Sequence, residues 1–164
     1  HQYKINAKAA FDGEVWQWHQ DYGTWARDDG MPEPRAMNIA LFLDDVTEFN
    51  GPLWIIPGSH REGVLEAGHD LKTTSYPLWT LDKATITRLA RERGIFSAKG
   101  KAGSVLMFHS NIVHASSPNI GPWGRTIVYL SLCHVDNHIR ELSGRNGSRT
   151  ATLRRSRRPT TTAC

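Results

Sequence analysis

The chain has 164 residues, 39% of them hydrophobic and 22% charged, which is typical of a globular domain with one core. No apolar run approaches the roughly 18–20 residues that cross a bilayer, so we expect no membrane-spanning helix. The net charge of +4 comes from residues 140–164, whose seven Arg and one Glu give +6. Residues 1–139 therefore carry a net charge of −2. This excludes the basic surface that is typical of a nucleic-acid-binding domain.

Short strands are predicted over the first half of the chain, because runs of apolar residues alternate with turns rich in Gly, Pro, Asn and Asp. The predicted strands cover 2–8, 14–21, 35–43 and 53–56. Residues 61–80 show no clear pattern and are predicted to be irregular.

One helix is predicted over 81–93, with Asp82 as its N-terminal cap and Gly94 as its end. It is followed by further predicted strands at 95–99, 104–108, 112–116 and 125–134. About eight short strands and one helix indicate an all-β fold, and a double-stranded β-helix (a cupin-like jelly roll) is the natural candidate. We expect residues 1–139 to form this core and the Arg-rich segment 140–164 to be a disordered tail.

The two cysteines, Cys133 and Cys164, are too few and too far apart to form a disulfide framework or a Cys-type zinc site. Cys133 lies in an apolar run, so we expect a buried thiol and a reducing, cytoplasmic location. The sequence begins at His1 rather than Met. We therefore expect it to be a piece of a longer protein, which could form a homodimer.

The most informative stretch runs from Trp16 to Trp25 and contains His19 and Asp21. In a strand, residues i and i+2 point to the same face, so this pair is expected to converge on one point. An imidazole and a carboxylate are two-thirds of the 2-His-1-carboxylate set that holds Fe(II) in non-haem oxygenases. By itself, the spacing fits a surface pair better than a metal site.

The third ligand has to come from a distant part of the chain. His114 is the best candidate, but His109 also ends a predicted strand, and strand parity does not choose between them because Ser110-Asn111 turns the chain. Arg125 follows His114 by eleven residues, and its guanidinium could form a bidentate pair of hydrogen bonds with a carboxylate of an anionic cosubstrate. Ser116 could donate to the same carboxylate.

Taken together, these residues resemble the phytanoyl-CoA dioxygenase superfamily and, within it, the ectoine hydroxylases. The resemblance rests on Trp18-His19-Gln-Asp21, Thr24-Trp25, Asp29-Gly30-Met31-Pro32, Gly51-Pro52-Leu53, Pro57-Gly58-Ser59-His60, and the stretch from Phe108 through His114 to Asn119. It covers roughly residues 1–139. Members of the family carry further residues before the position of His1, so the N-terminal part of the family fold is expected to be missing.

The resemblance implies an Fe(II)- and 2-oxoglutarate-dependent dioxygenase that uses O2. It implies metal ligands at His19, Asp21 and His114, with no ligand role for His109. It also implies that the cosubstrate is bound by four residues, namely Arg125, Ser116, Gln2 and Asn6. Trp25 and Gln2 are expected near a small-molecule substrate.

Three positions depart from the ectoine hydroxylase pattern: Trp16 and Tyr129 stand where that pattern has Phe, and Ala40 where it has Ser. Trp16 and Tyr129 are expected to line the substrate pocket. We therefore expect hydroxylation of a small polar molecule, ectoine-like or amino-acid-like. The alternatives are an oxygenase of the same superfamily acting on an acyl thioester or a secondary metabolite, a halogenase, which the presence of Asp21 disfavours, and a non-catalytic jelly-roll binding module.

Overall fold

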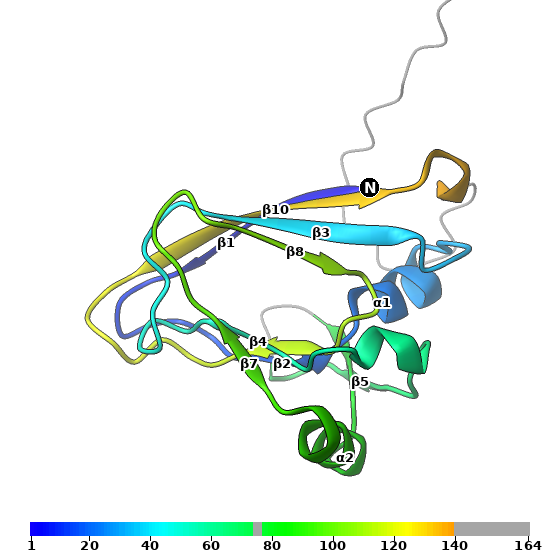
Figure 1. Ribbon diagram of the computed structural model, residues 1–164, viewed down its shortest axis with the longest axis horizontal. Coiled ribbons are helices and arrows are strands. Elements are labelled where there is room, and N and C mark those ends of the chain that lie inside the picture. Colours follow the sequence, from blue (N-terminus) through cyan, green and yellow to red (C-terminus); the bar gives the residue numbers. More distant parts are fainter. Residues whose placement is uncertain (74–76, 140–164) are drawn as a thin grey trace, which may run out of the picture.

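The computed structural model describes residues 1–73 and 77–139, and the predicted tail over 140–164 lies outside the described residues. Two antiparallel β-sheets face each other across the core (Figure 1). One sheet has four strands in the order β1 (Gln2–Lys8), β10 (Arg125–Cys133), β3 (Ala36–Phe42) and β8 (Val105–His109). The other has six, in the order β5 (Gly68–Asp70), β6 (Leu78–Thr80), β2 (Trp16–His19), β9 (His114–Ser116), β4 (Leu53–Ile55) and β7 (Phe96–Ala98).

The space between the two sheets is filled by side chains from alternate positions of their strands. On β3 every second residue is buried, as expected for a strand with one face on a core. The inward residues Ala40, Phe42, Ile127 and Tyr129 of the four-stranded sheet pack against Leu53 and other buried side chains of the opposite layer. This arrangement confirms the predicted mainly β class.

Helix α2 (Lys83–Arg93) forms as the sequence predicts. The Asp82 carboxylate accepts hydrogen bonds from the backbone N–H groups of Ala84 and Thr85, and Gly94 ends the helix with a φ of 73°, a conformation that favours glycine. Leu89 is fully buried in a cluster with Ile56, Leu81 and Val113. The helix lies on the side of the six-stranded sheet away from the other sheet (Figure 1).

Two of the predictions for local structure were wrong. Residues 61–80 contain the β5–β6 pair, and the short 3-10 helix η1 (Ser59–Glu62) reaches into this stretch. The predicted strand over 14–21 ends at His19, and a second α-helix, α1 (Asp21–Asp28), begins two residues later. A second 3-10 helix, η2 (Val135–Asn137), follows β10.

Within the described ranges, no helix has both the length and the apolar character that crossing a membrane requires. Cys133 is only partly buried, whereas a fully buried thiol was expected.

Candidate metal centre and cavity

The three predicted ligands meet where strand β2 ends, strand β9 begins and helix α1 starts. His19 is the last residue of β2 and His114 the first of β9, and the two are paired directly across the antiparallel ladder. Their ring centroids lie 4.2 Å apart. Asp21 is the first residue of α1, so the turn into the helix, not a shared strand face, brings its carboxylate to the histidines.

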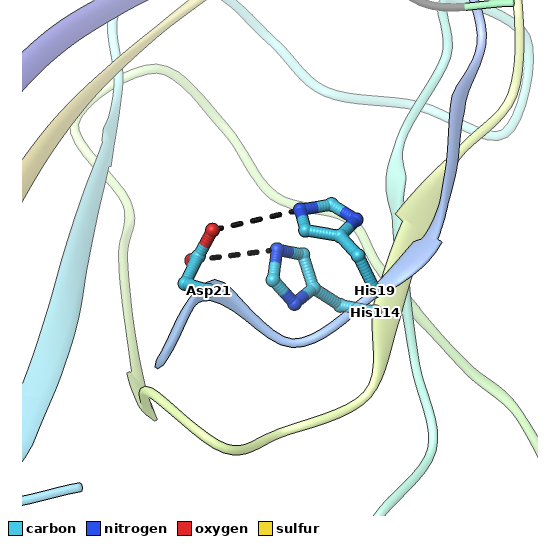
Figure 2. A group of neighbouring side chains, drawn as sticks. All are labelled: His19, Asp21 and His114. Atoms are coloured by element: carbon cyan, nitrogen blue, oxygen red, sulfur yellow. Dashed lines mark ion pairs between the residues drawn. The ribbon is translucent and has the colours of Figure 1, made fainter. Parts of the chain in front are cut away.

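The carboxylate of Asp21 faces both imidazoles (Figure 2). Its Oδ1 lies 3.5 Å from Nε2 of His19, and its Oδ2 lies 3.6 Å from Nε2 of His114. His19 and His114 are buried, and the Asp21 side chain is largely so. In the described ranges these three form the one group of His, Cys, Asp or Glu residues whose ligand atoms all lie within 4.8 Å of one another.

Hydrogen bonds to the backbone fix the tautomer of both histidines. Nδ1 of His19 lies 2.6 Å from the carbonyl oxygen of Gln17, and Nδ1 of His114 lies 3.0 Å from that of Ile112. A carbonyl only accepts, so each Nδ1 carries a proton, and in the neutral ring it is Nε2 that presents a lone pair to the shared space. Metal-bound histidines are oriented by this kind of outer hydrogen bond.

The local charges favour the metal-binding protonation states. Burial alone would raise the pKa of Asp21, but the nearby His114, His19 and Lys4 together outweigh it, so the pKa lies well below its usual range. Burial and the neighbouring His19 lower the pKa of His114 to about 4. At neutral pH the carboxylate is therefore ionised and His114 is neutral, which are the states that bind cations.

Gln20, between the two ligands, links the junction of β2 and α1 to neighbouring loops. Its side chain is 3% exposed and its amide donates to the carbonyl oxygens of Gly63 and Asn111. Its Oε1 accepts from the backbone N–H of Leu65. The backbone of Gln20 is extended, with φ −118° and ψ 125°, so the chain leaves the strand and enters the helix within one residue.

A cavity opens directly onto the triad. Its polar lining comprises Lys4, Asn6, His19, Asp21, His114 and Ser116. Its apolar and aromatic lining comprises Trp16, Leu53, Ala115 and Tyr129. The cavity has a volume of about 30 Å³ and combines the three clustered side chains, one ammonium group, several hydrogen-bonding groups and aromatic walls, a chemical character that matches an anionic or zwitterionic group.

Lys4 is the cavity residue that the sequence analysis missed. Its ammonium lies 5.1 Å from the ring centroid of Trp16 and 5.2 Å from that of Tyr129, and its charge contributes to the lowered pKa of Asp21. Gln2 and Asn6 had been singled out, and Lys4 lies between them on β1. Because side chains alternate along a strand, Lys4 shares the face of Gln2 and Asn6. The alternation was therefore enough to predict Lys4 as a further site residue.

Among the other predicted cosubstrate residues, Asn6 and Ser116 line the cavity, whereas Arg125 lies behind it and is 1% exposed. Nε and Nη2 of Arg125 donate to the carbonyl oxygen of Gly51 at 3.1 and 2.8 Å. Nη1 donates to Oδ1 of Asn6 at 2.5 Å and to its carbonyl oxygen at 3.2 Å. Arg125 is thereby connected to the cavity through Asn6.

The predicted substrate residues are divided between two places. Trp16 and Tyr129 line the cavity. Trp25 packs in a separate cluster with Tyr22, Met31 and Ala36, where its ring contacts His1 edge to face at 4.6 Å. In the described part of the chain, neither Trp25 nor Gln2 belongs to the lining of this cavity.

The competing His109 lies away from the triad. It is exposed at the end of β8, where its Nδ1 accepts from the backbone N–H of Asn111 and its ring lies 5.4 Å from that of His60. Burial and the neighbouring His60 lower the pKa of His109. His114, not His109, therefore completes the cluster.

A second buried cation, Lys8, lies opposite Arg125 in the β1–β10 ladder. It is 2% exposed, and its ammonium donates to the carbonyl oxygens of Glu14 (2.6 Å) and Ser117. Burial and the charge of Arg125 lower the pKa of Lys8 to about 7, and Glu14 offsets only part of this. Two cations are thus buried side by side next to the cavity.

The stability of the fold is expected to rise between pH 7 and 9.5 because of Lys8. When the pKa of a lysine is lower in the folded protein than in the unfolded chain, protonation of that lysine destabilises the fold. The destabilisation is complete below the folded-state pKa and disappears as the pH rises to the unfolded-state pKa. Urea unfolding should show that the wild type gains on the order of 2–3 kcal/mol relative to Lys8→Met over this interval. Lys101→Met, at an exposed lysine, is the control and should not alter the pH dependence. A constant difference between wild type and Lys8→Met at both pH values would contradict the assignment.

The comparisons with known proteins agree with this geometry. The family model described as phytanoyl-CoA dioxygenase (PhyH) matches residues 1–127. The chain is 37% identical, over 84% of its length, to an L-proline trans-4-hydroxylase of Streptomyces griseoviridis, and 38% identical, over 85%, to an ectoine dioxygenase of Bordetella parapertussis. Among solved structures, EctD from S. alaskensis with 2-oxoglutarate and 5-hydroxyectoine superposes with a TM-score of 0.74 at 35% identity, covering 88% of this chain.

The chain spans about half the length of these relatives. It covers 55% of the proline hydroxylase, 47% of the ectoine dioxygenase and 47% of the EctD chain. The superposition supports the predicted jelly-roll architecture of the part that is present.

Proposed function

Because this chain belongs to the phytanoyl-CoA dioxygenase family, we propose that it carries the catalytic core of an Fe(II)- and 2-oxoglutarate-dependent hydroxylase of small polar metabolites. The observation that carries the proposal is the buried cluster of His19, Asp21 and His114 at the wall of a cavity that also contains an ammonium group. A structural role alone gives no reason for two buried imidazoles and a carboxylate to share one point beside a cavity.

The donor set fits ferrous iron. Two imidazole nitrogens and one carboxylate oxygen are the facial set that leaves positions open for cosubstrate and oxygen. The residues that would hold the ion are His19 and His114 through Nε2, and Asp21 through its carboxylate. When bound, iron and 2-oxoglutarate would supply the oxidising chemistry, in which the oxo acid is decarboxylated to succinate and one oxygen atom of O2 enters a substrate C–H bond.

The cosubstrate is a dicarboxylate, so the protein has to offer cations and donors beyond the metal. Lys4 supplies an ammonium inside the cavity, and Ser116 and Asn6 supply donors on its wall. Arg125 acts from behind Asn6, which it holds in place by two hydrogen bonds. We propose that Lys4, Ser116 and Asn6 bind 2-oxoglutarate and that Arg125 positions Asn6, because charge-assisted hydrogen bonds to a carboxylate are the strong ones.

The substrate class follows from the remaining walls and from the relatives. Trp16 and Tyr129 give an aromatic wall against which a small ring can pack, beside the Lys4 ammonium. Ala40 is fully buried and is paired with Tyr129 in the sheet. Relative to the ectoine hydroxylase pattern, Tyr129 adds a hydroxyl where the pattern has Phe, and Ala40 lacks the hydroxyl of the Ser that the pattern has. Two relatives are named for reactions on L-proline and ectoine. We propose an amino-acid-like or ectoine-like substrate, with ectoine as the first candidate.

The experiment is a 2-oxoglutarate turnover assay with Fe(II). Succinate is measured with ectoine, L-proline, a panel of linear and cyclic amino acids, and a long-chain acyl thioester. We expect a small zwitterion to stimulate succinate formation well above the substrate-free rate, with one hydroxyl added per succinate. Lys4→Met should require a higher 2-oxoglutarate concentration for the same rate.

Two outcomes would contradict different parts of the proposal. Stimulation by the acyl thioester and by no zwitterion would overturn the substrate class while leaving the iron chemistry intact. Absence of a visible charge-transfer band on anaerobic mixing of the chain with Fe(II) and 2-oxoglutarate would overturn the cofactor assignment. The predicted domain boundary at residue 139, the homodimer and the cytoplasmic location stay predictions.

A further inference from the structure

A buried amide lies directly behind the carboxylate of Asp21. Asn38 is on the inward face of β3 and is 1% exposed. Its Nδ2 donates to Oδ2 of Asp21 at 2.7 Å. Asn38 does not line the cavity described above, so it reaches the site only through Asp21.

The amide of Asn38 is itself oriented by a second residue. Ser131 is paired with Asn38 across the β10–β3 ladder, is 4% exposed, and its Oγ lies 2.5 Å from Oδ1 of Asn38. An amide oxygen only accepts, so the hydroxyl of Ser131 must donate. With Oδ1 engaged in this way, the NH2 group of Asn38 is the end that faces Asp21, where a carboxylate can only accept. Each bond therefore fixes the direction of the next.

Asp21 needs such a partner because of its place in the chain. It is the first residue of α1, and a carboxylate in the first turn of a helix can fold back onto the free backbone N–H groups there. In this chain the backbone N–H of Tyr22 donates instead to the carbonyl oxygen of Ser110, and the Asp21 carboxylate accepts from Asn38. The side chain is thereby turned toward the histidines and away from its own helix.

We propose that Ser131 and Asn38 are a positioning pair for the metal-binding carboxylate, an inference that rests on the proposed metal site. Asn38 engages Oδ2 of Asp21 and so leaves Oδ1 as the oxygen available to an ion. Ser131 acts only through Asn38, by preventing the amide from turning its oxygen toward the carboxylate. The pair sets how Asp21 binds metal and touches neither cosubstrate nor substrate.

The test measures affinity for Co²⁺ by competition with a chromophoric chelator, which needs no turnover. Outer-shell partners of metal ligands typically change metal affinity 10–100-fold, so Asn38→Leu should weaken Co²⁺ binding on the order of 10–100-fold. Ser131→Ala should weaken it in the same direction by a smaller factor, and Ser131→Thr, which keeps the hydroxyl, should bind like the wild type. The double variant should bind no more weakly than Asn38→Leu alone, because Ser131 acts through Asn38.

Matched controls separate positioning from stability. Asn137→Ala and Ser110→Ala alter an equally buried amide and hydroxyl that bond to backbone groups of residues 33–35. They should lower the melting temperature without changing Co²⁺ affinity. Full Co²⁺ affinity in folded Asn38→Leu, or, if that variant does not fold, full affinity in Ser131→Ala, would overturn the inference. Equal Co²⁺ binding by wild type and Asp21→Ala would instead overturn the proposed metal site itself.

Discussion

Asp21→Ala is expected to abolish the visible band of the anaerobic complex with Fe(II) and 2-oxoglutarate and to weaken metal binding by more than 100-fold. Loss of an outer-shell partner typically costs about 10–100-fold in metal affinity, and loss of a direct ligand should exceed that. Asp21 also supplies the one carboxylate of the cluster and so balances the charge of a divalent cation. Removing it leaves only two imidazole ligands, which bind the ion less firmly and supply no negative charge.

A matched control for this substitution lies on the same helix. Asp28 is the last residue of α1 and accepts a hydrogen bond from the indole nitrogen of Trp79 at 3.0 Å, away from the cavity. Asp28→Ala should keep the charge-transfer band and lose only some stability. An undiminished band in Asp21→Ala would rule out the facial triad, and melting curves in the presence of a chelator would show whether both variants fold.

Substitutions at Arg125 should affect stability and cosubstrate binding together. Arg125→Met removes the donors to Gly51 and Asn6 while keeping most of the side-chain volume, and unsatisfied buried acceptors cost about 1–3 kcal/mol each, so a loss of roughly 2–6 kcal/mol is expected in urea unfolding. Arg125→Lys keeps the charge, but a single ammonium does not span both acceptors. Asn6 then loses part of its support, so this variant should bind 2-oxoglutarate more weakly, by at most on the order of 1–3 kcal/mol, the range for a hydrogen bond to a charged group.

The control for the two substitutions at Arg125 is Arg93→Lys. Arg93 also binds through its guanidinium, to Glu62 at 2.5 Å, but it is the last residue of α2, and this helix lies on the far side of the six-stranded sheet (Figure 1). Arg93→Lys should leave the affinity for 2-oxoglutarate, measured by titration of the charge-transfer band, unchanged. An Arg125→Lys protein that is folded and has wild-type cosubstrate affinity would refute the cosubstrate role, and the stability role of Arg125 would then stand alone.

The meeting of His19, Asp21 and His114 was predicted correctly, although the local structure assumed for it was wrong. His19 and Asp21 were expected on one strand face, yet Asp21 begins a helix. The signal for α1 is weak because its eight residues include Gly23 and Thr24, which are poor helix formers. An apolar spacing was present all the same, since Tyr22, Trp25 and Ala26 lie three and four residues apart on the face that packs into the core.

Other features depended on contacts that one sequence does not reveal. Strand parity would have been enough to place Lys4 on the same face of β1 as Asn6, and Asn38 on the same face of β3 as Ala40. It does not tell which inward residues from different strands meet, because that requires the register that pairs Asn38 with Ser131. The bonds of Arg125 to Asn6 and Gly51 join residues 119 and 74 positions apart and exist only once both sheets are assembled.

The single residue between β2 and α1 has a mechanical consequence. Only Gln20 separates His19 from Asp21. The distance between the Cα atoms of these two candidate ligands is therefore set by the backbone torsion angles of that one residue. The amide of that residue is bonded to Gly63, Leu65 and Asn111, so two loops hold those torsion angles in place. Force applied to either loop would be transmitted to the spacing of the ligands through three hydrogen bonds. Residues 63–65 are thus connected through Gln20 to the chain between two of the candidate ligands.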